Sequence, residues 1–130
     1  MTNTIKVHTP AGYMLINPAE FFPNTVGNVR KLVKAIKATA RYTRPDEGPA
    51  ALLQLQSACR EKLVEVERCR KEYKQLYEAS INFKSTSIYD DVYYSKRALV
   101  VSYVLQRIDR DAKKLESNLD ILEGADNGTD

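Results

Sequence analysis

Residues 52–76, LLQLQSACREKLVEVERCRKEYKQL, decide the fold, because their apolar side chains recur at the spacing of a helix that packs along one seam. Positions 52, 55, 59, 66, 69, 73 and 76 hold Leu, Leu, Cys, Val, Cys, Tyr and Leu, and Lys62 is the single interruption. Intervals of three and four residues place these side chains on one face of a helix. Pro49 suits a first helical position, so we predict one long helix over residues 49–80.

A second long helix is predicted over residues 87–122. Ser87 with Asp90 three residues on suits its start, and Gly124 follows its end. It carries an apolar stripe at the same spacing, made of Val101, Val104, Ile108, Ala112, Leu115, Leu119 and Leu122. Because the connection between the two helices is short, we expect them to run antiparallel.

The N-terminal part predicts two smaller elements. Residues 4–16 read as a β-hairpin, because TIKVHT alternates in polarity and a Pro–Ala–Gly turn precedes GYMLI. Residues 18–42 read as helical, with Asn17 as the cap and an interruption at Pro23. The predicted fold class is therefore mainly α, with a two-stranded hairpin, one medium helix and two long antiparallel helices.

Length and composition favour one domain. The chain has 130 residues, 43% of them hydrophobic and 28% charged, which is an ordinary globular balance. We expect a single domain over residues 1–124 and a frayed acidic tail over residues 125–130. Two helices of roughly 45–50 Å would make the protomer elongated, since a compact globule of this size has a radius of gyration near ~14 Å. Cys59 and Cys69, ten residues apart on one helix, are too distant for a mutual disulfide.

The segment Ala98–Leu105 (ALVVSYVL) is apolar nearly all the way round. Such a helix segment needs burial on more than one side, and a single neighbouring helix covers only one. We therefore predict a homo-oligomer, a dimer or a hexamer, that assembles through residues 98–105.

Several functional classes find no support in the sequence. No stretch approaches the ~20 apolar residues that cross a bilayer, and no secretory signal opens the chain, so we expect a cytoplasmic protein with no membrane contact. His8 is the sole histidine, which excludes a histidine-based metal cluster or a Ser–His triad within one chain. Asp90 and Asp91 are explained by the start of a helix. We expect no enzymatic activity, no catalytic residues, no metal and no cofactor.

A basic stripe is the clearest charge feature. Residues 1–108 contain 17 Lys and Arg against 10 Asp and Glu, a net charge of +7, whereas residues 109–130 contain 3 against 7, a net charge of −4. No acidic residue occurs between Asn24 and Pro45, where cations recur every three or four residues at Arg30, Lys34, Lys37 and Arg41. This stripe is either a solvated helix face or an anion surface that contacts phosphates.

An aromatic residue stands in the polar connection between the two long helices. Phe83 is flanked by Asn82, Lys84 and Thr86, and Tyr93 follows soon after. A ring beside amide, hydroxyl and ammonium groups suits stacking on a base while the polar groups contact sugar or phosphate. The alternative is that Phe83 packs downwards and closes the apolar end of the helical hairpin.

This order of elements, together with Phe83, Asn82 and arginines on both long helices (Arg60, Arg107 and Arg110), resembles the phage anti-Thoeris proteins. The resemblance extends over residues 4–122 and is one of architecture. It implies a non-enzymatic sponge that assembles as an oligomer and sequesters cyclic ADP-ribose isomers, or cyclic oligonucleotides, in the cytoplasm of an infected or lysogenic bacterial host. The ligand-binding residues that it implies are Phe83, Asn82, Lys84, Thr86, Tyr93, Arg60, Arg107 and Arg110.

A second function stays open from the residues themselves. A small basic protein of phage or mobile-element origin could use the stripe at Arg30, Lys34, Lys37 and Arg41 to bind nucleic acid or an acidic protein surface as an inhibitor. The two functions differ in where cations and aromatic rings meet. A nucleotide sponge needs both at the helical-hairpin connection, whereas a nucleic-acid binder needs the basic stripe alone.

Overall fold

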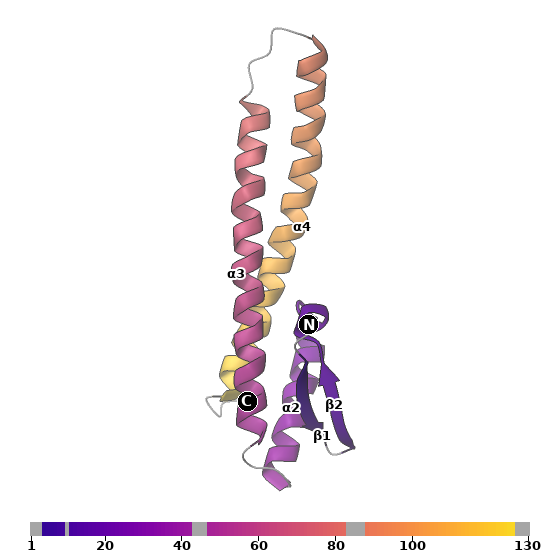
Figure 1. The fold of residues 1–130 in the computed structure, drawn as a ribbon, viewed down its shortest axis with the longest axis vertical. Helices are drawn as coiled ribbons and strands as arrows, with labels where there is room; N and C mark the ends of the chain where they lie inside the picture. The colour runs from indigo at the N-terminus through magenta and orange to yellow at the C-terminus, as the bar shows by residue number, and fades with distance from the viewer. Residues whose placement is uncertain (1–3, 10, 43–46, 83–87, 127–130) are drawn as a thin grey trace. The chain divides into compact units, whose positions relative to one another are not determined.

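The computed structural model describes residues 4–9, 11–42, 47–82 and 88–126. Within these ranges two strands and four helices follow one another: β1 (Ile5–Thr9), β2 (Gly12–Ile16), α1 (Pro18–Phe21), α2 (Val26–Tyr42), α3 (Glu47–Ile81) and α4 (Ile88–Asp126) (Figure 1). The prediction of a mainly helical fold with an N-terminal hairpin and two long helices is confirmed.

The chain divides into two compact units that share the two long helices. Unit 1 comprises residues 1–63 and 113–130, and unit 2 comprises residues 64–112. Unit 1 therefore contains the hairpin, α1, α2, the first half of α3 and the last part of α4. Among the described residues, unit 2 contains the second half of α3, Asn82 and the first 25 of the 39 residues of α4. The single domain expected from the sequence stays a prediction.

The hairpin is antiparallel, and one of its faces is buried in unit 1. Its register pairs Ile5 with Ile16 and Val7 with Met14. Ile5, Val7 and Ile16 are buried, and β1 packs against α2 (Figure 1). Gly12 follows the turn with φ +132°, a conformation that side-chain-bearing residues rarely adopt. The alternation of TIKVHT thus correctly identified the face that enters the core.

The helical stretch 18–42 is divided into α1 and α2 by residues 22–25. The Asn17 side chain caps α1 by accepting a hydrogen bond from the backbone N–H of Ala19, 3.1 Å away, and Pro18 is the first helical residue. The second start uses Thr25, whose hydroxyl accepts a hydrogen bond from the Asn28 N–H at 3.3 Å. The helical start expected after Pro23 therefore forms, with Thr25 closing the first turn.

A buried asparagine joins this second start to α4. The Asn118 side chain accepts a hydrogen bond from the backbone N–H of Asn24 and donates one to its carbonyl, each at 2.9 Å. Asn118 is fully buried, so these two bonds supply the partners that a buried amide requires. They fix the beginning of α2 to α4 within unit 1.

The core of unit 1 lies between its helices and the hairpin. Its largest fully buried apolar side chains are Phe22, Ile36, Leu55, Leu115, Leu122, Val7 and Val29. Polar contacts also join α3 to α4: Gln56 Nε2 donates to the carbonyl of Leu122 at 3.0 Å. Burial continues to Ala125, and α4 accordingly extends to Asp126 instead of ending before Gly124.

Unit 2 is a pair of antiparallel helix segments, and it contains none of the largest fully buried side chains of the described residues. The predicted seam of α3 is half-buried here at Val66, Cys69 and Leu76, and Tyr73 is exposed. On α4, Ala98, Val101 and Ala112 are buried. Arg70 Nε lies 2.9 Å from Asp109 Oδ1 and links the two helices by charge. Among the described residues, this buried oxygen has no aligned hydrogen-bond donor, so the link is an ion pair only.

Candidate functional site

The connection between α3 and α4 is where the sequence places the nucleotide site. Phe83, Lys84 and Thr86 lie outside the residues that the structure describes. Asn82, which follows the last residue of α3, is exposed, and its backbone N–H donates to the carbonyl of Glu78 at 3.0 Å. Its side chain is thus presented to solvent at the end of the helix.

Two tyrosines and an arginine form a cluster near the start of α4. The rings of Tyr93 and Tyr94 meet edge to face, with centroids 5.1 Å apart and planes at 89°. The Arg97 guanidinium carbon lies 5.6 Å from the centroid of the Tyr94 ring, within range of a cation–π contact. Tyr93 is 60% exposed, and Tyr94 and Arg97 are half-buried. We call Asn82, Tyr93, Tyr94 and Arg97 the hairpin-end group.

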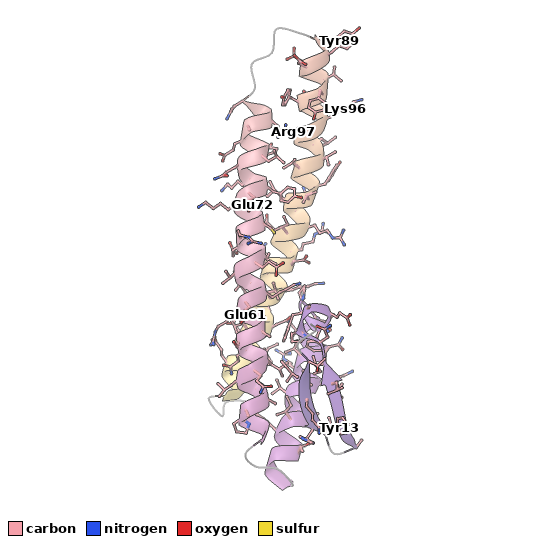
Figure 2. All side chains as sticks on the ribbon, in the orientation of Figure 1. Tyr13, Glu61, Glu72, Tyr89, Lys96 and Arg97 are labelled. Carbon is pink, nitrogen blue, oxygen red and sulfur yellow. The ribbon has the colours of Figure 1, made fainter. Side chains whose placement is uncertain are left out.

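Helix geometry explains how the hairpin-end group is arranged. Tyr94 and Arg97 are three residues apart, so they lie on adjacent turns of one face. Figure 2 shows Arg97 on the side of α4 towards α3, and Lys96 on the opposite side. A guanidinium held over a ring is partly desolvated and keeps donors for an anion, while the exposed Tyr93 ring offers a surface for stacking.

The remaining arginines implied by the resemblance lie elsewhere. Arg107 and Arg110 are exposed on α4, 14 and 17 residues beyond Tyr93. At 1.5 Å per residue these separations are about 21 and 26 Å along the helix axis, so α4 does not bring either arginine beside Tyr93 within a single chain. Arg60 belongs to unit 1, where its Nη2 pairs with Glu123 Oε1 at 2.8 Å.

Sequence reasoning assigned two members of the hairpin-end group, Asn82 and Tyr93, to the site and missed the other two, Tyr94 and Arg97. The signal that could have found them is their spacing, since residues three apart on a helix are neighbours.

The basic stripe lies on α2 in unit 1. Arg30, Lys31 and Lys34 are exposed, and no ion pair involves them among the residues that the structure describes. Lys37 is half-buried, and the side chain of Arg41 is not among those described. The opposite side of α2 buries Val29, Val33 and Ile36. The members Arg30, Lys31 and Lys34 are therefore solvent-facing cations that form no ion pair with the described residues.

The two cysteines are free and differ in environment. Cys59 is fully buried, and its thiol lies 3.5 Å from the Leu115 carbonyl, to which it donates a weak hydrogen bond. Burial raises the pKa of Cys59 from 9.0 to about 11; nearby Arg60 lowers it and Glu123 raises it further. A buried thiol with so little thiolate at neutral pH has a packing role. Cys69 is half-buried in unit 2.

Metal-binding clusters and membrane-spanning helices are both absent from the described residues. No group of three or more His, Cys, Asp or Glu side chains in this part of the chain could hold a metal ion. Within the same ranges, none of the helices combines the length and the apolar character needed to span a membrane.

Comparisons with known proteins add no relative. No protein-family model matches the chain, and neither the curated proteins nor the solved structures that were searched contain a match.

Proposed function

We propose that this protein is a non-enzymatic binding protein that sequesters a cyclic nucleotide immune signal, and so blocks bacterial anti-phage defence from the cytoplasm of an infected or lysogenic host. The ligand class is a cyclic ADP-ribose isomer or a cyclic oligonucleotide. The observation that carries the proposal is the hairpin-end group, in which an arginine and tyrosine rings meet beside the α3–α4 connection.

The chemistry of this group suits a small anionic ligand with a base. The Tyr93 ring is 60% exposed and offers a face on which an adenine can stack. Arg97, held over Tyr94, offers guanidinium donors to a phosphate. Asn82, also exposed, offers an amide that both donates and accepts hydrogen bonds to sugar hydroxyls. These three kinds of contact recognise a nucleotide without transforming it.

Calorimetric titration with cyclic ADP-ribose isomers and with cyclic trinucleotides tests the proposal. We expect saturable binding, and intact ligand should be recovered after heat denaturation of the complex. Tyr93→Ala and Arg97→Gln should each weaken binding about tenfold to a hundredfold, the loss associated with roughly 1–3 kcal/mol per stacked base. Arg68→Gln removes an exposed arginine of α3 outside the group and serves as the matched control. Binding of none of these nucleotides, or release of a cleaved ligand, would contradict the proposal.

Substitution of Phe83 distinguishes between two roles of its ring: stacking on a base of the ligand, or closing the apolar end of the helical hairpin. If its ring stacks on a base, Phe83→Ala lowers affinity about tenfold to a hundredfold and changes stability little. If it closes the hairpin core, the same change lowers the free energy of unfolding by about 3 kcal/mol and leaves affinity intact. We expect the loss of affinity to be larger, because the neighbours Asn82, Lys84 and Thr86 are polar. Melting temperature and calorimetry on one variant give both quantities.

A second candidate function is binding of nucleic acid or an acidic protein surface through α2. The observation that favours it is the exposed row Arg30, Lys31 and Lys34, which lacks ion-pair partners within the described part of the chain. Under this function, combined Lys34→Gln, Lys37→Gln and Arg41→Gln should abolish binding to random duplex DNA and flatten its salt dependence.

The matched control for that triple variant lies on α3. Combined Arg68→Gln, Lys71→Gln and Lys74→Gln removes the same charge from a face where carboxylates are interleaved. If the two triple variants weaken DNA binding equally, the effect is one of net charge, and the specific role of α2 is refuted. Nucleotide affinity should survive both changes if the hairpin-end group is the ligand site.

A further inference from the structure

One side of α4 in unit 2 presents large side chains to solvent along its whole length. Tyr89 is 87% exposed, Val100 60% and Tyr103 62%. They belong to a series with spacings of mostly three and four residues, which places its members on one face of the helix. We call this series the outer face; it comprises Tyr89, Val92, Lys96, Leu99, Val100, Tyr103 and Arg107.

The outer face points away from α3. Figure 2 shows Tyr89 and Lys96 on the side of α4 opposite to α3. The side towards α3 contains Ala98 and Val101, of which 9% and 5% is exposed. α4 is therefore apolar on two sides in unit 2, and α3 covers one of them. Isolated exposed apolar residues are ordinary, whereas a continuous stripe of them marks a binding surface.

We propose that a second copy of this chain binds the outer face, and that the two α4 helices pair antiparallel about a two-fold axis close to Leu99 and Val100. The same surface then serves both chains, as two-fold symmetry requires. Apolar residues lie at the centre of the face, and cations and tyrosines lie towards its ends. This distribution is that of a buried interface core with a polar rim.

Charge decides the orientation of the two helices. If the axis passes between Leu99 and Val100, each residue of one chain lies level with a residue of the other chain, and the two residue numbers add up to 199. Lys96 of one chain then meets Tyr103 of the other, and Arg110 meets Tyr89, so cations lie over rings. A parallel pair would instead place Lys96 against Lys96 and Arg107 against Arg107, which is repulsive.

The exposed area is of the size that a dimer requires. The outer face offers on the order of 600 Å² per chain, given 150–250 Å² for each large aromatic side chain, against about 800 Å² per partner in a standard interface. The stems of Lys96 and Arg107 add apolar surface at the edges. A second copy of α4 presents this area with matching length, about 30 Å from Tyr89 to Arg110.

This inference does not rest on nucleotide binding, because no residue of the outer face belongs to the hairpin-end group. Sedimentation or light scattering without ligand therefore tests it separately. We expect wild-type protein at micromolar concentration to have at least twice the 14.8 kDa mass of one chain. Val100→Glu should halve the observed mass while leaving the melting temperature of the protomer nearly unchanged.

Substitutions at two further valines, Val64 and Val101, serve as controls for Val100→Glu. Val64→Glu introduces the same charge at a residue of α3 that is 70% exposed and lies off the outer face, so it should leave the mass unchanged. Val101→Glu buries the charge between α3 and α4 and should lower the melting temperature. A wild-type monomer, or a Val100→Glu variant that keeps the wild-type mass, would overturn the proposal.

Cysteine cross-linking tests the orientation. Val100→Cys stands near the two-fold axis and should form an intermolecular disulfide with its own copy under mild oxidation. Tyr89→Cys should form none, because the antiparallel pairing separates the two copies of residue 89 by about 31 Å along the helix axis. The wild-type chain controls for native Cys69. Efficient cross-linking at residue 89 would show a parallel pair and refute the proposed geometry.

Discussion

Units 1 and 2 share the same two helices, and they differ in how well those helices are covered. In unit 1, α3 and α4 bury Leu55, Leu115 and Leu122 completely. In unit 2, the same helices leave Leu99, Val100 and Tyr103 more than half exposed. All of the largest fully buried side chains among the described residues belong to unit 1.

The cause of the difference is the number of layers. In unit 1 the hairpin packs on α2, and hydrogen bonds join the start of α2 to Asn118 of α4, so the long helices have further elements beside them. Among its described residues, unit 2 has two helix segments, and two helices make one seam between them. The comparison shows that the apolar residues of a helix are buried only where other elements cover them. An apolar surface that stays open within one chain is available to another.

Replacing a leucine by alanine should lower the free energy of unfolding much more in unit 1 than in unit 2, and this is the largest difference that we expect. Leu115→Ala removes a fully buried side chain of unit 1 and should lower the free energy of unfolding by about 2–5 kcal/mol. Leu99→Ala makes the same change in unit 2, where the side chain is 55% exposed, and should cost less than about 1 kcal/mol in dilute protein. Urea unfolding measures both. Equal losses would mean that the two units are covered alike.

Substitution of Asn118 measures how much its two buried hydrogen bonds contribute to the stability of unit 1. Asn118→Ala removes both hydrogen bonds to the Asn24 backbone and should lower the free energy of unfolding by about 1–3 kcal/mol. Asn28→Ala is the control, because it removes one exposed side-chain bond to Asn24. Urea unfolding should show little change for this control. If Asn118→Ala is as mild as the control, water replaces the lost bonds and the site is less enclosed than the structure indicates.

Burial of the Cys59 thiol should make the free energy of unfolding depend on pH. Because its folded pKa is raised to about 11 from 9.0, the associated stability is complete below pH 9 and is lost as pH rises towards 11. The loss is of order 2 kcal/mol, at about 1.4 kcal/mol per pH unit. Unfolding of wild type and Cys59→Ala should be compared from pH 8 to 11, and the variant should show a shallower decline. Parallel curves would show that Cys59 does not contribute.

The smallest effects are expected for the ion pairs. Arg60→Gln breaks the exposed pair with Glu123 in unit 1 and should change the free energy of unfolding by roughly 0–1 kcal/mol. Arg70→Gln removes the partner of Asp109, whose Oδ1 is buried, and should cost somewhat more. Thermal unfolding at low and high salt measures both. A larger loss at Arg60 would reverse this ranking.

The hairpin and the helices were predictable because their signals are local. Alternation at Ile5 and Val7, and the capping of α1 by Asn17, act over a few neighbouring residues. The all-round apolar character of residues 98–105 was equally visible. The stripe that begins at Val101 indicated its buried side, and Val101 is buried. That Val100 on the neighbouring side is 60% exposed was not visible from the sequence.

The site residues expected from the sequence stay predictions. Asn82 follows α3 directly and Tyr93 lies in the second turn of α4, whereas Tyr94 and Arg97 were not expected at the site. Arg107 and Arg110 were grouped with them by type, yet the rise of the helix separates them from Tyr93. Residue type gives the chemistry of a site, but distance along a rigid helix decides which groups one ligand reaches.

The elements, their order and the apolar stripes could be predicted from the sequence, because these follow from side-chain periodicity and turn chemistry within a few residues. The fold alone shows that Asn118 binds Asn24, 94 residues away, and that α4 continues past Gly124 to bury Ala125. It also decided that the long helices are enclosed in unit 1 and open in unit 2. Burial depends on which other elements fill the surrounding space, and that is a property of the whole fold.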